Sequence, residues 1–434
     1  MTVDLEFMQH LTALIIGLIV LAQPSLSQDG PQLPIVLQNA DSIVGTGPME
    51  SGIREFLGNV RFTQGNVTVT CDRAIHNVAL NRADLYGHVV VKQGSVTISA
   101  PYISYDGNTY QADATRGIKV VEGASTITSR VGRYSTQTHI MTFTDSVAAV
   151  DDSVRIWADT LTYDRDADTS VAHGRVVVSD SSGSAWLTGD HAYRNAVTQR
   201  IRMCGNAAAW QWDPGGPDTV YVAADTLLMT KDKGLNRYEA VSAVQLVRGA
   251  VSARADTMVY VTDPGRIDLL GHPILWSDSM LIVADTIIAD VPDKTLRSVV
   301  GLTKAILVSR TDTLYPDRFD QIGGDVVLLS IDHDTVRQLS AIGNAQSITF
   351  RTEEKRPEGL AKAAADTIRA NFEHGQLSDV YWLGGIEGEH HPEPVVAGRA
   401  ESYRLPGFVW RDDRPVMARP VQPFTKKTVV TGKP

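Results

Sequence analysis

The chain has 434 residues, of which 43% are hydrophobic and 21% are charged, so it can bury a sizeable core and is neither wholly disordered nor a polytopic membrane protein. Its 40 lysines and arginines against 50 aspartates and glutamates give a formal net charge of −10, without a long basic run. This charge balance argues against nucleic acid as a partner, because binding a phosphate backbone by counterion release requires a basic surface.

The first predicted element is an export signal. Residues 11–22 form an uncharged apolar run of 12 residues, which is the length of a signal-peptide core and shorter than the ~20 residues that span a bilayer. Small residues follow the run, and we predict a signal peptide over residues 1–27. The segment ahead of the run departs from the usual pattern, since it carries Asp4 and Glu6 and no basic residue. A start at Met8 would remove both acids; an uncleaved anchor or a buried helix is the alternative.

A block of about 30 residues then recurs along the chain. One mark of the block is the tripeptide Ala-Asp-Thr followed by alternating apolar residues. This mark begins at Ala158, Ala224, Ala255, Ala284 and Ala365. A second mark is a glycine that opens another apolar run. These glycines are Gly58, Gly87, Gly117, Gly174, Gly205, Gly271, Gly301, Gly343 and Gly385, and the spacing indicates missing members near Val147 and Val244.

Each block is predicted to contain three short strands. The Ala-Asp-Thr strand ends in turn residues such as Asp263-Pro264-Gly265, a return strand ends at the glycine, and the glycine opens a third strand because it tolerates a sharp bend. Residues 360–372 are the one stretch with helical character, but they contain an Ala-Asp-Thr mark and are predicted as strand. The recurring aspartate is predicted to bond a backbone N–H where its strand begins.

Units this short bury an apolar face only by stacking on one another, which gives one continuous core. The predicted fold class is therefore all-β: an elongated, open stack of repeats of the β-jellyroll or β-solenoid type. Residues 210–217 interrupt the repeat with turn residues and two tryptophans, so we predict one repeat region over residues 40–205 and a second over residues 206–385. Residues 386–434 hold seven of the 19 prolines and are predicted to form a Pro-rich C-terminal arm.

The repeat resembles a known family. The blocks that begin at Gly58 and Gly87, GNVRFTQGNVTV and GHVVVKQGSVTI, are similar to the Gly-x-Val-x-Val-x-Gln-Gly unit of the OstA or LptA-like proteins. In that family the unit precedes an Ala-Asp strand with a tyrosine, as in residues 158–163 here. The resemblance extends over residues 40–385, which makes both repeat regions OstA-like, and residues 395–420 resemble the end of OstA-like proteins with two such regions.

The resemblance implies a periplasmic β-jellyroll whose apolar interior holds the acyl chains of lipopolysaccharide. Such units assemble end to end into a bridge from the inner to the outer membrane. The implied partners are lipopolysaccharide and either other lipopolysaccharide-transport proteins or further copies of the chain, joined by β-strand addition at the terminal strands. The implied location is the periplasm, with association with the outer membrane as an option. The resemblance implies neither an enzyme nor a cofactor.

Candidate residues for lining a lipid trough occupy alternate positions on equivalent strands. They are Val60, Phe62, Val89, Val91, Ile118, Val120, Val176 and Val178. Each acyl CH₂ buried against them would contribute ~0.8 kcal/mol. Core packing without a cavity is the alternative for each residue, because the sequence leaves open whether the two sheets close on one another.

Two other classes of protein fit a stacked β repeat. A secreted β-solenoid that acts on polysaccharide carries paired carboxylates on neighbouring rungs, and a purely structural β rod binds no ligand. The repeated aspartates, such as Asp159 and Asp225, lie in nearly identical sequence contexts. Catalytic acid and base carboxylates need unequal environments, which favours the transport hypothesis.

No metal site is predicted. Residues 164–168 begin like a calcium loop, but the sixth and twelfth positions are Thr169 and Arg175 rather than glycine and glutamate, so a hairpin turn is favoured. Cys71 and Cys204 belong to no ligand motif and are predicted to be free thiols.

Overall fold

The computed structural model describes residues 35–420, apart from residues 49, 153, 213–218, 233–234, 293–294, 311–314, 334, 354–355 and 374–375. The predicted signal peptide, residues 1–27, lies outside the described residues. The described chain divides into two compact units, here called the N-terminal unit (residues 35–207) and the C-terminal unit (residues 208–419). The division falls within strand β15 (Arg200–Gln211).

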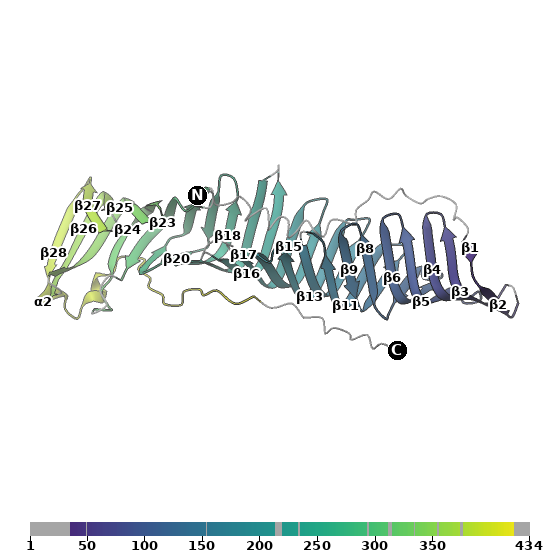
Figure 1. Ribbon diagram of the computed structural model, residues 1–434. Coiled ribbons are helices and arrows are strands. Elements are labelled where there is room, and N and C mark those ends of the chain that lie inside the picture. Colours follow the sequence, from purple (N-terminus) through teal and green to yellow (C-terminus); the bar gives the residue numbers. More distant parts are fainter. Residues whose placement is uncertain are drawn as a thin grey trace. The chain divides into compact units, whose positions relative to one another are not determined.

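The N-terminal unit consists of antiparallel strands, and most of the long strands pair with the next long strand along the chain (Figure 1). Ahead of β15 these strands are β1 (Val36–Asn39), β2 (Ser42–Thr46), β3 (Ile53–Gln64), β4 (Val67–Asn77), β5 (Arg82–Gln93), β6 (Val96–Asp106), β7 (Gln111–Ala114), β8 (Ile118–Glu122), β9 (Ser125–Ser129), β10 (Val131–Ser135), β11 (Ile140–Val150), β12 (Val154–Asp164), β13 (Thr169–Asp180) and β14 (Ala185–Asn195).

The C-terminal unit repeats the same arrangement. Its strands after β15 are β16 (Val220–Asp232), β17 (Leu235–Arg248), β18 (Val251–Val261), β19 (Arg266–Leu270), β20 (Ile274–Ser277), β21 (Met280–Val283), β22 (Thr286–Asp290), β23 (Ser298–Ser309), β24 (Asp320–Asp332), β25 (Thr335–Glu353), β26 (Arg356–Glu373), β27 (Gln376–Leu383) and β28 (Glu387–Pro392). A short helix, α2 (Glu393–Val396), and a 3₁₀ turn, η2 (Ala400–Tyr403), follow. In the described part of the chain, no helix has the length and apolar character that crossing a membrane requires.

The prediction of an all-β, jellyroll-like stack of repeats is confirmed, but the repeat contains two long strands rather than three short ones. The predicted return strand and third strand are the two halves of one continuous strand, such as β3 or β13, bent at the glycine. The ladder to the neighbouring strand continues through the bend as a β-bulge. Residues 360–372 lie within β26 and are strand, as predicted.

The bend, here called the corner, consists of two consecutive residues in the left-handed region. At Gly174 and Arg175 the φ angles are 71° and 47°, and the register with β14 shifts between His173 and Val176. Other corners have the same pair of left-handed residues. They are Gly58–Asn59, Gly87–His88, Asp145–Ser146, Gly205–Asn206, Ser242–Ala243, Gly271–His272, Thr303–Lys304, Gly343–Asn344 and Gly384–Gly385. Gly301 was therefore assigned wrongly, because the corner of β23 lies at Thr303–Lys304 and Gly301 pairs with Ile287 within the ladder.

The recurring aspartate lies beside the corner of a neighbouring strand. The Asp159 Oδ2 atom would be 2.5 Å from a β-carbon on Gly174, and the Asp159 carboxylate accepts a hydrogen bond from the Arg175 side chain at 2.5 Å. Similar side-chain bonds at other corners are Asn59–Asp41, His88–Asp72, Asn206–Asp190 and Asn344–Asp325. The partner at these corners is thus a side chain of the adjacent strand, instead of the predicted backbone N–H.

The inside of each corner is apolar and alternates between a larger and a smaller residue. The residue after the left-handed pair is buried, as for Val60 and Val89, which are 0% and 1% exposed. Its cross-strand partner is the small residue that precedes the aspartate: Cys71 for Val60 and Ala100 for Val89. The Ala-Asp-Thr mark therefore encodes a small residue inside the corner and a carboxylate outside it, because successive side chains of a strand point to opposite faces.

Candidate functional site

The two halves of each bent strand face one another across an apolar interior. Phe56 and Phe62 lie on either side of the corner of β3, and their rings meet edge to face with centroids 5.2 Å apart. They belong with Val60, Ala74 and Ile103 to one cluster that contains residues of both halves. The interior of the N-terminal unit is therefore the space between the two halves of the folded sheet.

The eight predicted lining residues all lie in the half of the strand that follows the corner. Val60, Val89, Val120, Val176 and Val178 are buried, whereas Phe62, Val91 and Ile118 are partly buried and pack against the interior cluster. They occupy two levels, the first directly after the corner and the second two residues further on. Whether they hold lipid or only pack against one another stays a prediction.

The second level forms an unbroken row of apolar side chains, here called the interior row. Cross-strand pairing links its ten members in order: Phe62, Val69, Val91, Ile98, Val120, Ile127, Ala149, Ile156, Val178 and Leu187. Directly opposed residues on one face of a sheet lie within contact distance of each other. The row therefore gives the N-terminal unit a continuous apolar strip that crosses ten strands.

Sequence analysis identified four of the ten members of the interior row, Phe62, Val91, Val120 and Val178. The missed members on the intervening strands include Val69, Ile98 and Ile156. Each lies two residues before the small residue of an Ala-Asp type mark, for example Ile156 before Ala158. That spacing was a usable signal, because residues i and i+2 of a strand share a face.

A second interior row, here called the rim row, lies near the turn end of the other half of the strands. Its members are Ala83, Tyr105, Ala112, Tyr134, Met141, Tyr163, Ser170 and Arg194, linked in this order by cross-strand pairing. Gly132 shows that this face points inward, since a β-carbon there would meet the Ile118 side chain at 2.8 Å. The interior thus passes from aliphatic residues at the corner to hydroxyls and a guanidinium at the rim.

Burial perturbs the ionisable groups of the rim row. The pKa of Tyr163 is raised to about 12, first by burial and then by the nearby Asp168 carboxylate, which accepts a hydrogen bond from the Tyr163 hydroxyl at 3.4 Å. Burial also lowers the pKa of the Arg194 guanidinium, against the attraction of Asp168. Tyr134 likewise has a raised pKa because it is buried.

The C-terminal unit has its own interior row. Val222, Leu246, Ala253, Leu275, Ile282, Leu307 and Ile322 are joined by pairing in this order. All seven belong to, or pack against, one core cluster. The same bent-strand geometry therefore builds an apolar interior in both units.

The predicted C-terminal arm begins within strand β28, which pairs with β26, and its described part from Glu393 on lies along strands of the C-terminal unit (Figure 1). Leu405, Phe408 and Trp410 pack with Ile306 and Val308 of β23. The intervening Leu307 belongs to the interior cluster, so the arm covers the outer face of this half of the sheet.

Hydrogen bonds and a buried ion pair hold the arm. The Trp276 indole donates to the Arg411 carbonyl at 2.9 Å, and the Trp210 indole donates to the Ala418 carbonyl at 2.7 Å. Where the arm begins, Arg318 donates two hydrogen bonds to the Glu393 carboxylate at 3.0 and 2.5 Å. The Arg318 side chain is only 6% exposed, which makes this pair an interior anchor.

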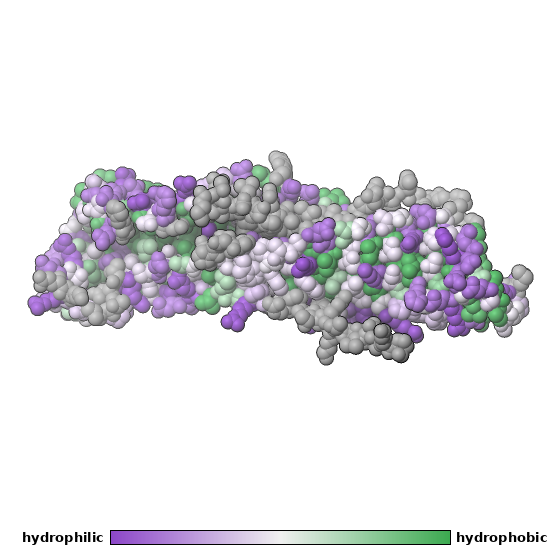
Figure 2. Space-filling view, in the orientation of Figure 1, coloured by the Kyte–Doolittle hydropathy of each residue, from purple (hydrophilic) through white to green (hydrophobic). Residues whose placement is uncertain are grey.

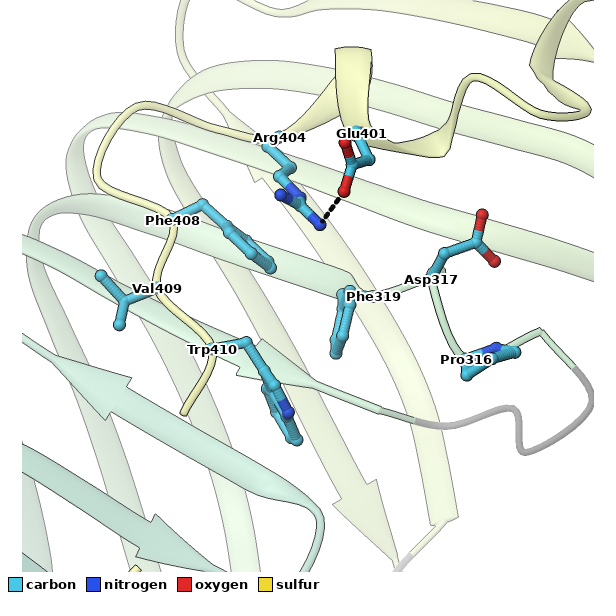
Figure 3. A pocket seen from close by; sticks show the side chains of 8 residues that line it. All are labelled: Pro316, Asp317, Phe319, Glu401, Arg404, Phe408, Val409 and Trp410. Atoms are coloured by element: carbon cyan, nitrogen blue, oxygen red, sulfur yellow. Dashed lines mark hydrogen bonds and ion pairs between the residues drawn. The ribbon is translucent and has the colours of Figure 1, made fainter. Parts of the chain in front are cut away.

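A pocket of about 620 Å³ lies between the arm and the segment that leads into β24 (Figure 3). Its lining residues are Pro316, Asp317, Phe319, Glu401, Arg404, Phe408, Val409 and Trp410. Arg404 is paired with Glu401 at 2.9 Å and lies over the Phe408 ring. Because five of the eight lining residues belong to the arm, the pocket exists only while the arm is docked.

The motifs considered for metal binding have structural roles. In the turn after β12, the Asp164 carboxylate accepts hydrogen bonds from the backbone N–H groups of Asp166 and Ala167, which is turn chemistry. Over residues 35–420, excluding the gaps, no group of three or more potential ligands is suited to a metal ion. Cys71 is buried, Cys204 is half-buried and both are free cysteines.

This arrangement defines a class of protein: an all-β repeat whose bent strands enclose a continuous apolar interior. Two family models match the chain. Residues 33–118 match the OstA-like protein family, and residues 126–295 match the family described as the LptA/(LptD N-terminal domain) LPS transport protein. The chain is OstA/LptA-like over these two stretches, and the model that matches residues 126–295 describes a lipopolysaccharide transport protein.

One similar solved structure is LptH from Pseudomonas aeruginosa, described as the LptA-homologous periplasmic component of the lipopolysaccharide transport device. It shares 19% sequence identity with this chain; the match covers 27% of this chain and 82% of LptH, with a TM-score of 0.24. No curated protein sequence matches the chain.

Proposed function

We propose that the protein binds lipopolysaccharide, with the acyl chains lying on the interior row, and contributes to its transport through the periplasm. The observation that carries the proposal is the unbroken register from Phe62 to Leu187. An acyl chain has no fixed register of its own, so a strip without polar interruptions can take it at any point along its length. Each buried CH₂ contributes ~0.8 kcal/mol.

The two terminal strand edges support assembly into a bridge. Val36, Ile43 and Val44 on β1 and β2 are 45%, 56% and 48% exposed, and Figure 2 shows apolar residues at this end of the N-terminal unit. Leu377 and Trp382 on β27 are 58% and 40% exposed. Exposed apolar edges favour strand addition, so the proposed partners are further copies or other lipopolysaccharide-transport proteins.

The proposed domain organisation follows the sequence analysis. Residues 1–27 are a signal peptide that directs the chain to the periplasm, where outer-membrane association remains an option. Residues 40–205 and 206–385 are the two OstA-like regions, and residues 386–434 are the C-terminal arm.

Lipid binding is tested on protein produced in a lipopolysaccharide-containing host and purified without detergent. Native mass spectrometry is expected to show co-purifying lipopolysaccharide that is released and rebinds saturably. A lipid-free protein that also takes up no added lipopolysaccharide would overturn the proposal and direct attention to polysaccharide cleavage or a purely structural rod.

The position of the lipid is tested with a photoreactive side chain at Val91, which lies on the interior row. The matched control is Val90, whose side chain points to the opposite face because it is one residue away. Crosslinking to lipopolysaccharide is expected at Val91 and not at Val90. Equal crosslinking at both positions would place the lipid outside the interior.

A further inference from the structure

Two histidines lie directly opposite one another on adjacent strands of the N-terminal unit. His173 on β13 pairs with His191 on β14, and both residues are exposed. The neighbouring Ala172 is buried, so the two histidines lie on the outer face of the sheet, because successive side chains of a strand point to opposite faces. A dissolved ion therefore reaches both rings without entering a cavity.

The two imidazole rings are in direct contact. Their Nδ1 atoms are 2.7 Å apart, and the ring planes meet at 73° with centroids 5.0 Å apart. One Nδ1 atom therefore donates a hydrogen bond and the other accepts it with its lone pair. Other described histidines have a carboxylate as their partner, such as His88 with Asp72. The pair of His173 and His191 instead places two imidazole nitrogens side by side, and imidazole is a ligand suited to divalent transition metals.

The separation of the two nitrogens distinguishes between coordination geometries. With metal–nitrogen bonds of about 2.0 Å, two ligands at a right angle are about 2.8 Å apart, whereas two ligands at the tetrahedral angle are about 3.3 Å apart. The observed separation of 2.7 Å matches the right angle. Right-angled, tetragonal coordination by nitrogen and oxygen is typical of Cu²⁺ and Ni²⁺, whereas Zn²⁺ favours a tetrahedron.

The charged residues of the two adjoining corners favour a cation at this place. Arg175, two residues after His173, donates hydrogen bonds to the Asp159 carboxylate at 2.5 and 3.2 Å, which neutralises its charge. Asp190 directly precedes His191 and adds a second carboxylate. Two acids and one base therefore flank the pair, so the local charge attracts a cation rather than repelling it.

We propose that His173 and His191 chelate a Cu²⁺ ion through their Nδ1 atoms. The donor ring takes its alternative neutral tautomer, with the proton on Nε2, so that both Nδ1 lone pairs bind the ion and the chain neither gains nor loses a proton. Over the described ranges no group of three or more potential ligands is suited to a metal ion, so water fills the remaining positions. The site lies outside the apolar interior and is independent of the proposed function.

The test titrates the full chain with Cu²⁺ in a buffer that binds no metal, by isothermal titration calorimetry and electron paramagnetic resonance. The wild type is expected to give a tetragonal Cu²⁺ spectrum with couplings to two imidazole nitrogens. His173→Ala and His191→Ala are each expected to weaken binding at least about tenfold, since even the outer-shell partners of metal ligands contribute that much. Urea denaturation without copper checks that the variants are folded, which the exposure of both side chains favours.

The matched control is His88→Ala, because His88 is an exposed corner histidine of the same unit whose partner is the Asp72 carboxylate. Its Cu²⁺ affinity is expected to equal that of the wild type. An equal loss in His88→Ala would show that copper binds exposed histidines without selection and would overturn the site. A loss in only one of the two variants at His173 and His191 would also overturn it, because a chelate needs both rings. Zn²⁺ binding as tight as Cu²⁺ binding would overturn the assignment of a tetragonal ion.

Discussion

The carboxylate of Asp159 occupies the place where a β-carbon on Gly174 would lie, since the two atoms would be only 2.5 Å apart. The two residues lie on adjacent strands and are 15 positions apart in the chain. The same relationship joins Asp72 with Gly87 and Asp256 with Gly271. The two marks of the sequence repeat are therefore two sides of one contact.

The first prediction concerns Gly174→Ala. The added methyl group strains a residue at φ +71° and displaces Asp159, and we expect the free energy of unfolding to fall by about 3 kcal/mol. The matched control is Gly183→Ala, where φ is +75° but no atom lies within 4 Å of the new β-carbon. The control should lose only the strain energy, about 1 kcal/mol. Urea denaturation measures both variants. If Gly174→Ala and Gly183→Ala lost the same free energy of unfolding, the contact between Asp159 and the corner glycine would contribute nothing to stability.

The second prediction concerns the anchor of the C-terminal arm. Arg318→Met leaves the Glu393 carboxylate, which is 23% exposed, without its paired cation. Breaking a buried ion pair in this way costs about 3 kcal/mol of stability. The double variant Arg318→Met/Glu393→Gln removes the unpaired charge and should recover part of the loss. Urea denaturation of the two variants checks this; identical stabilities would show that the charge pair is not what anchors the arm.

The third prediction concerns the docking of the arm further along. Trp276→Phe removes the indole N–H that donates to the Arg411 carbonyl, which costs about 1 kcal/mol. Trypsin cleavage after Arg411 should accelerate about fivefold, because the cost raises the population of undocked arm. Trp186→Phe, whose indole donates to the Gly183 carbonyl at 3.0 Å in the other unit, should leave this cleavage rate unchanged. An unaltered rate in Trp276→Phe would contradict the assignment.

The fourth prediction concerns alkaline pH. The pKa of Tyr163 is raised from 10.0 to about 12 in the folded state, whereas in the unfolded chain it remains near 10. Between these values the folded state holds a proton that the unfolded state has lost, so the stability contributed by Tyr163 falls as pH rises from about 10 to 12. It is fully present below pH 10.

The measurement for this fourth prediction is the difference in unfolding free energy between wild type and Tyr163→Phe. We expect that difference to shift against the wild type by about 2 to 3 kcal/mol between pH 9 and pH 12. A pH-independent difference for Tyr163→Phe would mean that its phenol is not perturbed by burial.

Much of the fold is predictable from the sequence because each repeat carries its own local signals. Turn residues, period-two apolar patterns and left-handed glycines are all read without knowledge of distant contacts. Where the glycine spacing has gaps, near Val147 and Val244, the corners are formed by Asp145–Ser146 and Ser242–Ala243. Non-glycine residues adopt the left-handed region at a modest cost, so the glycine mark was sufficient but not necessary.

The division of each repeat into strands was predicted less well. A glycine ahead of an apolar run is compatible with either a new strand or a bulge within one strand, and only the ladder distinguishes the two. The position of the arm was also inaccessible, because contacts such as Trp276 with Arg411 join residues 135 positions apart. The alternation of apolar residues was enough to predict which side chains of a strand face the interior. The alternation does not show which residues of neighbouring strands lie opposite one another, such as Phe62 and Val69, because that depends on the strand register.

Because each aspartate and glycine pair fixes the register of only its own two strands, the N-terminal unit is extendable in discrete steps. Excising residues 159–189 would join Ala158 to Asp190 and preserve both the small residue and the aspartate of the mark. Neighbouring strands are about 4.8 Å apart, so losing two strands would shorten this unit by about 10 Å. Duplication or deletion of one genetic segment would therefore change the reach of the interior in fixed increments while leaving every remaining corner intact.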